Sequence, residues 1–104
     1  MDIKRKEINA KMIFDDLSDS NEVNYEVFLF FLKQGREIEF TYNGEEYFIP
    51  NHKKGRVLLN EEGDHLNHYI ENMEEFVSNA KIDGLTLKEI FQNQNDKIEF
   101  GIIF

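Results

Sequence analysis

The sequence contains no cysteine in 104 residues. Disulfides, cysteine-ligated zinc or iron–sulfur sites and thiol nucleophiles are therefore excluded, and stability has to come from packing. The longest unbroken apolar run extends only from Val27 to Leu32, far short of the ~20 residues that a membrane-spanning helix requires. The first residues also lack the apolar stretch of a signal peptide. We therefore expect a soluble cytoplasmic protein.

The chain is rich in apolar side chains. Hydrophobic residues make up 40% of it and aromatic residues 13%, including ten phenylalanines. This content is too high for an intrinsically disordered protein, even though 32% of the residues are charged. A chain of this length supplies one hydrophobic core and not two. The sequence therefore predicts a single domain over residues 1–104 that folds alone.

Acidic residues outnumber basic ones by 21 to 12, which gives a formal net charge of −9. The imbalance is concentrated in two stretches without lysine or arginine: residues 12–32 contain five acids and residues 57–80 contain six. Such a surface repels the phosphates of nucleic acids and anionic lipids, so we expect neither direct nucleic-acid binding nor membrane binding. A basic protein is the complementary partner, although acidic side chains also serve simply to keep a domain soluble.

Two helices are predicted in the first third of the chain. Apolar residues at helical spacing indicate a helix over residues 3–17. Asn24 is a typical helix N-cap and Gly35 a typical stop, so we predict a second helix between them. The apolar run inside this second segment would also fit a buried strand, and this alternative stays open.

A β-hairpin is the clearest local signal. Asn43-Gly44 accepts the positive φ angles of a two-residue turn, and alternating residues precede it. The register pairs residue 42 with 45, 40 with 47 and 38 with 49. A third strand is predicted over residues 56–60. The predicted buried face consists of Ile38, Phe40, Tyr42, Tyr47 and Ile49, and the other face of Glu37, Glu39, Thr41, Glu46 and Phe48.

Two helices and a strand are predicted in the last third of the chain. Ile70, Met73, Val77 and Ala80 recur at helical spacing, and Thr86-Leu87-Lys88-Glu89 has the pattern of a capping box that begins a short helix over residues 87–92. Alternating apolar residues then indicate a final strand over residues 98–104, with Phe100 and Phe104 in the core. The expected fold is α+β, a small antiparallel sheet with helices packed on one face, in the order α-α-β-β-β-α-α-β.

The sequence contains no phosphate-binding loop, dinucleotide-binding glycine motif, serine-hydrolase elbow or zinc-protease motif. His65 and His68 would approach a metal-ligand spacing only if both lay on one helical turn. We therefore predict no catalytic, cofactor or metal site. We expect the third helix and the loop before it to form one partner-binding surface. Its candidate residues are the acids of the second base-free stretch: Glu61, Glu62, Asp64, Glu71, Glu74 and Glu75.

Part of the chain resembles a known group of proteins. The string from Gly35 to Gly44, the acidic segment after it, the string from Asn79 to Gly84 and the residues Leu87-Lys88-Glu89-Ile90 are similar to small uncharacterised acidic proteins of Gram-positive bacteria and their phages. The resemblance covers residues 35–91. It implies a bacterial or phage origin and an order of a hairpin followed by helices, and it carries over no activity. Small acidic phage proteins include inhibitors of host defence nucleases.

Three classes of function fit these features. The first is a non-enzymatic acidic protein that inhibits or regulates a basic, nucleic-acid-handling partner, such as an anti-CRISPR or anti-restriction protein of a phage. The second is an immunity-type or other regulatory interaction module that does not mimic nucleic acid. The third is a metal-dependent enzyme that uses the region of His65 and His68. Salt dependence separates the first class from the second, and a metal titration separates the third.

Overall fold

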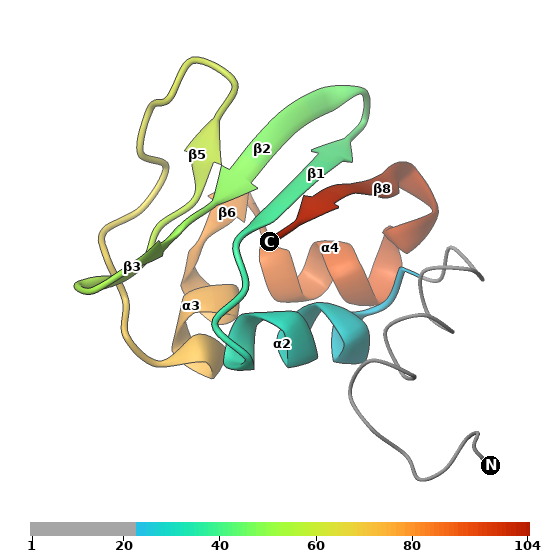
Figure 1. The fold of residues 1–104 in the computed structure, drawn as a ribbon. Helices are drawn as coiled ribbons and strands as arrows, with labels where there is room; N and C mark the ends of the chain where they lie inside the picture. Colours follow the sequence, from blue (N-terminus) through green and yellow to red (C-terminus); the bar gives the residue numbers. More distant parts are fainter. Residues whose placement is uncertain (1–22) are drawn as a thin grey trace, which may run out of the picture.

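The computed structural model describes residues 23–104, so the helix predicted over residues 3–17 lies outside the described residues. Three helices lie on one face of a four-stranded antiparallel sheet of order β5-β2-β1-β8 (Figure 1). This arrangement confirms the predicted α+β class. The elements are α2 (Tyr25–Lys33), β1 (Ile38–Tyr42), β2 (Glu45–Ile49), β3 (Asn51–His52), β4 (Gly55–Arg56), β5 (Leu59–Asn60), α3 (Met73–Asn79), β6 (Lys81–Ile82), β7 (Leu85–Thr86), α4 (Leu87–Asn93), the 3-10 turn η1 (Asn95–Lys97) and β8 (Ile98–Ile103).

The apolar run before the hairpin forms helix α2, as predicted. The Asn24 side chain accepts a hydrogen bond from the Val27 N–H at 2.9 Å, which satisfies one of the amides left free at a helix start. Burial along the run has the period of a helix, because the residues at its two ends are buried and the two in the middle are only partly buried. The Phe28 ring stacks on Phe91 of α4 with centroids 3.8 Å apart and meets Phe40 of β1 edge to face at 6.4 Å. These rings lie at the centre of the core.

The hairpin has the predicted register, with Ile38 opposite Ile49, and its predicted inward face is buried. Asn43 and Gly44 adopt φ angles of 53° and 81°, as a turn of this type requires. Helix α4 also begins as predicted, because Thr86 and Glu89 form the reciprocal hydrogen bonds of a capping box. Both features depend on residues close together in the chain.

Replacing Gly44 with valine is expected to lower the free energy of unfolding by about 1 kcal/mol or more, because a β-branched residue is strained at positive φ. No other atom lies within 4 Å of the position that a Cβ would take at Gly44, so the loss would report backbone strain alone. Urea denaturation measures it. Glu46→Val places the same residue on an exposed strand position of the hairpin as the control, and equal stability of the two variants would contradict the prediction.

The third strand, predicted over residues 56–60, is wrong in its extent. Gly55 and Arg56 pair with β3, whereas Leu59 and Asn60 pair with β2. Between them Val57 and Leu58 are both buried, at 1% and 0% exposure. Consecutive residues of a pleated strand point to opposite faces, so this double burial interrupts the strand. The β3–β4 pair also replaces the plain turn that was expected over residues 51–55.

The third helix is shorter than predicted. Ile70 lies outside it, because its backbone bridges to Arg56 through N–H···O bonds of 2.8 and 3.0 Å. The helix begins after Asn72, whose side chain accepts a hydrogen bond from the Glu75 N–H at 2.9 Å. An Asn side chain that caps a helix also ends the helix in the upstream direction. The helical spacing of Ile70 to Met73 is therefore a coincidence of sequence.

The alternation predicted for the final strand fails beyond Gly101. The pairing of β8 with β1 shifts between Ile38 and Phe40, so an extra residue of β8 lies opposite Glu39. A bulge of this kind reverses which side chains face inward. Ile103 then packs against the core, while Ile102 and Phe104 are 55% and 62% exposed. The prediction that Phe104 belongs to the core is wrong.

Candidate functional site

The first three candidate acids lie in a tight turn that follows β5. The Asn60 side-chain oxygen accepts hydrogen bonds from the N–H groups of Glu62 at 3.1 Å and Asp64 at 2.9 Å, which shapes the turn. Gly63 adopts φ +86°, a conformation that favours glycine. The side chains of Glu61, Glu62 and Asp64 are all exposed. The local sequence thus holds three carboxylates in solvent on a turn that is fixed by its own asparagine.

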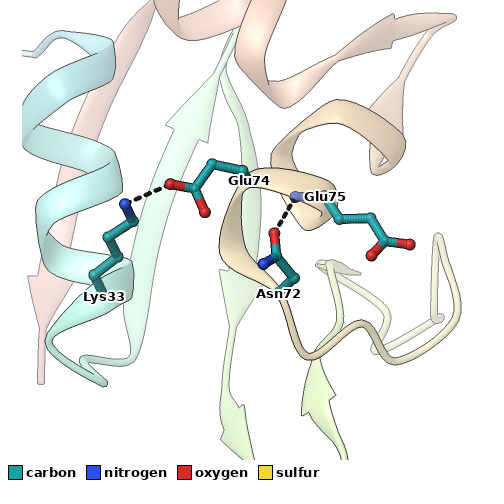
Figure 2. A network of polar contacts seen from close by, with 4 residues as sticks. All are labelled: Lys33, Asn72, Glu74 and Glu75. Atoms are coloured by element: carbon teal, nitrogen blue, oxygen red, sulfur yellow. Dashed lines mark hydrogen bonds and ion pairs between the residues drawn. The ribbon is translucent and has the colours of Figure 1, made fainter.

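The other three candidate acids lie at helix α3. Glu71 precedes the helix, and Glu74 and Glu75 occupy its first turn, where the helix dipole favours negative charge. Glu74 forms an ion pair with Lys33 of α2, as Figure 2 shows. The hydrogen bond from Lys33 is the main reason that the pKa of Glu74 lies below its ordinary value. The base that partly neutralises this group therefore comes from a distant part of the sequence.

The six candidate acids do not form one patch. Figure 1 shows the turn after β5 at the same end of the molecule as the tip of the β1–β2 hairpin, whereas α3 lies beside α2 at the other end. The expectation that the turn and the helix form one continuous surface is therefore wrong. It assumed that the helix began before Ile70, whereas residues 65–72 cross the molecule without forming a helix.

The turn after β5 instead meets acids from two other segments. An open depression of about 370 Å³ lies among the start of β2, the turn after β5 and the turn between β6 and β7. Lys81 is the one base that lines it. The carboxylates that line it are Glu45, Glu46, Glu61, Glu62 and Asp83.

The acidic side chains around the depression affect the pKa of the Tyr47 hydroxyl. It lies 3.5 Å from a carboxylate oxygen of Glu45, to which it donates a hydrogen bond. Burial is the main cause that raises the pKa of Tyr47, and the negative charges of Glu45 and Asp83 raise it further. The hydroxyl therefore keeps its proton at neutral pH and directs it toward the Glu45 carboxylate. The depression is lined by five carboxylates, which accept hydrogen bonds and carry negative charge, so its composition suits a basic ligand.

Sequence reasoning identified Glu61 and Glu62 but missed Glu45, Glu46 and Asp83. Asp83 adopts φ +52° in the β6–β7 turn, a conformation that aspartate tolerates better than most residues. The Asp83-Gly84 pair signalled this turn, and the hairpin register placed the two glutamates at the start of β2. No signal in the sequence showed that these segments meet, because their contact depends on the topology of the whole domain.

The histidines lie in a different arrangement from a metal-binding helix turn. His65 bridges to Leu59 in an extended segment, so His65 and His68 do not share a helical turn. The ring of Tyr69 lies against His52, with centroids 4.8 Å apart, and against His65 at 5.7 Å. In residues 23–104 no group of three or more His, Cys, Asp or Glu side chains could hold a metal ion.

Comparisons with protein-family models, with curated proteins and with solved structures found no match for this chain. Within the part of the chain that the structure describes, none of the helices combines the length and apolar character needed to cross a membrane.

Proposed function

We propose that this chain is a non-enzymatic acidic protein that binds and inhibits a basic, nucleic-acid-handling protein, in the manner of a phage inhibitor of CRISPR or restriction enzymes. The observation that carries the proposal is the composition of the depression, which is lined by five carboxylates from three segments and by a single base. Proteins that bind nucleic acids present basic surfaces to phosphates. Carboxylates gathered in a depression compete for such a surface through charge complementarity.

The charge of the whole molecule supports the same proposal. A net charge of −9 steers a basic protein toward the surface from a distance and raises the association rate at low salt. The acids at α3, which are Glu71, Glu74 and Glu75, add to this field without touching the depression. We assign direct contact to Glu61 and Glu62, with Asp64 beside them, and long-range attraction to the acids at α3.

An inhibition assay tests the proposal. Purified CRISPR and restriction nucleases of Gram-positive bacteria are assayed for DNA cleavage with increasing amounts of this protein. We expect at least one nuclease to be inhibited, and we expect inhibition to weaken about tenfold or more between ~50 and ~300 mM salt, because contacts between charges are screened. Excess substrate DNA should relieve it. Failure to inhibit any nuclease of the panel at the lower salt concentration would contradict the proposal.

Two charge-matched variants test the assignment of contacts. The variant with Glu61→Lys and Glu62→Lys is expected to lose inhibition about tenfold or more, because it reverses charges inside the depression. The variant with Glu71→Lys and Glu75→Lys carries the same total charge but leaves the depression intact, so it should lose much less and mainly in association rate. Equal losses in both variants would show that only net charge matters. Both leave the Lys33–Glu74 ion pair in place.

A regulatory interaction module without nucleic-acid mimicry is the second candidate function. The exposed side chains of Leu66, Ile102 and Phe104 favour it, because large apolar groups on a surface often contact other proteins. An apolar interface of this kind should keep its affinity as salt rises. The salt series described above therefore separates the two candidates.

A further inference from the structure

Among residues 23–104, no helix covers the face of the sheet that points away from α2, α3 and α4 (Figure 1), and we call it the open face. Residues that pair across neighbouring strands share a face. The strand register therefore shows which side chains lie on the open face. Thr41 lies between Glu46 of β2 and Glu99 of β8. In the next row Phe48 lies opposite Glu39. Leu59 of β5 lies on the other side of Phe48. The open face therefore carries several carboxylates around one aromatic ring, with one apolar neighbour at its edge.

A groove of about 250 Å³ runs over this face. Gly101 helps to keep it open, because a Cβ at this position would lie 3.3 Å from the Cβ of Glu39. The groove and the acidic depression form a continuous surface, because they share Glu46, Tyr47, Asn60 and Glu61. Its principal side chains are Glu39, Thr41, Glu46, Phe48, Asn60 and Glu61.

The groove has the chemistry of a site for a cation. It contains no lysine, arginine or histidine, and within residues 23–104 its carboxylates form no ion pair. The Phe48 ring is only half buried, with Glu39 opposite it on β1 and Glu46 two residues before it on the same strand. A cation placed over an aromatic face and beside carboxylates is attracted by both.

Arginine fits this arrangement better than lysine. Its planar guanidinium stacks on an aromatic ring and presents several N–H donors in a fork that matches carboxylates, whereas the lysine ammonium is a compact and strongly hydrated charge. The aromatic ring distinguishes the groove from a purely acidic surface, because a planar guanidinium can stack on the ring and an ammonium group cannot. Arginine is also one of the side chains with which nucleic-acid-binding proteins contact phosphates.

We infer that the open sheet face is the docking surface for an arginine-bearing segment of the partner protein, with one guanidinium against Phe48 and between Glu39 and Glu46. This inference rests on the proposed function and names the chemistry that the partner presents. The segment lies over β1 and β2 and leaves α3 uncovered. The acids of the adjoining depression then contact basic residues that flank the arginine.

The probes are two blocked peptides of equal length, one of arginine and one of lysine, titrated into the isotope-labelled full chain. Nuclear magnetic resonance follows the backbone amides. We expect the arginine peptide to bind about fivefold more tightly than the lysine peptide. The amides that shift should belong to β1, β2 and the turn after β5, and not to α3.

Three variants test the assigned contacts. Phe48→Leu keeps an apolar side chain but removes the aromatic face, so it should weaken arginine binding about fivefold and abolish the preference over lysine. Glu39→Gln keeps the shape of the side chain and should weaken both peptides through loss of charge. Glu71→Gln is the matched control with the same loss of charge at α3, and it should bind both peptides nearly as the natural protein does.

The outcomes are distinguishable from failure of the proposed function. Peptide-induced shifts confined to α3, or an arginine preference that survives in Phe48→Leu, would overturn the inference. If Phe48→Leu and Glu39→Gln still inhibit the nuclease as the natural protein does, the inference falls while the proposed function stands. Shifts of the β1 and β2 amides that depend on protein concentration without peptide would identify a second copy as the occupant, which also overturns it.

Discussion

Replacing Gly55 with alanine is expected to lower the free energy of unfolding by about 3 kcal/mol or more, because backbone strain and overpacking add at this position. Gly55 adopts φ +121°, a conformation that side chains rarely allow. A Cβ there would lie 2.6 Å from the carbonyl carbon and oxygen of Ile70 and 2.9 Å from the Glu71 nitrogen. These are backbone atoms that the Arg56–Ile70 bridge holds in place, so they cannot move aside cheaply.

Gly63→Ala is the matched control for this prediction. Gly63 also has a positive φ, +86°, but no atom lies within 4 Å of its would-be Cβ. We expect it to lose only about 1 kcal/mol, the cost of the backbone conformation alone. Urea denaturation of both variants measures the difference. Equal free energies of unfolding for Gly55→Ala and Gly63→Ala would show that the Ile70 backbone does not lie as close to Gly55 as the structure places it.

Features that depend on neighbouring residues could be predicted from the sequence. The hairpin register followed from Asn43-Gly44 and the alternation before it, because a two-residue turn leaves only one pairing. The start of α4 followed from Thr86 and Glu89, whose side chains and backbones satisfy each other within one turn. In both cases the decisive interaction lies within four consecutive residues, 42–45 and 86–89.

Features that depend on distant contacts could not be predicted in this way. Leu58 leaves the strand because its N–H donates to the Asn67 side chain at 2.7 Å and its carbonyl accepts from Leu66. Ile70 leaves the helix because Arg56 takes up its backbone groups. The bulge at Gly101 likewise appears only when β8 lies beside β1. Each of these partners is absent from the local pattern that the sequence displays.

The candidate site also contains residues that the sequence indicated and residues that only the fold brings to it. The base-free stretch revealed Glu61 and Glu62 as unusual in composition. It could not reveal Asp83, which reaches the same depression from the turn between β6 and β7. The stretch also suggested a single patch, whereas residues 65–72 separate the turn after β5 from α3. Charge along a chain indicates the kind of partner, but only the fold shows which charges act together.

Arg56 connects the region of the Gly55 contact to helix α2. It is the one charged side chain among residues 23–104 that is buried, with 1% exposure. Its guanidinium donates to the Leu32 carbonyl at the end of α2 at 2.9 Å and to the Pro50 carbonyl at 3.1 Å. Burial lowers the pKa of Arg56, and the negative charge of Glu37 opposes this effect. Arginine keeps its proton even so, because its pKa lies far above neutral pH.

Truncation of Arg56 should therefore be among the most damaging single changes in the protein. Arg56→Ala is expected to lower the free energy of unfolding by about 3–5 kcal/mol, because it removes both carbonyl contacts and leaves a cavity where the stem packed. Arg56→Met keeps most of the stem and should lose less, about 1–3 kcal/mol. Lys54→Met in the adjacent exposed turn is the control and should change stability by less than about 0.5 kcal/mol.

A double-mutant cycle with Glu37 tests whether the guanidinium is held as a charge. Glu37→Gln removes the carboxylate that opposes the pKa-lowering effect of burial, so it should destabilise the natural protein. In the Arg56→Met background the same change should have a smaller effect, since no buried cation remains for Glu37 to stabilise. Equal effects in the two backgrounds would show that Arg56 acts only through packing and its two carbonyl contacts. A coupling between the two residues would show that the Glu37 carboxylate stabilises the buried Arg56 cation. This is the same charge complementarity that we propose between the acidic surface and its basic partner.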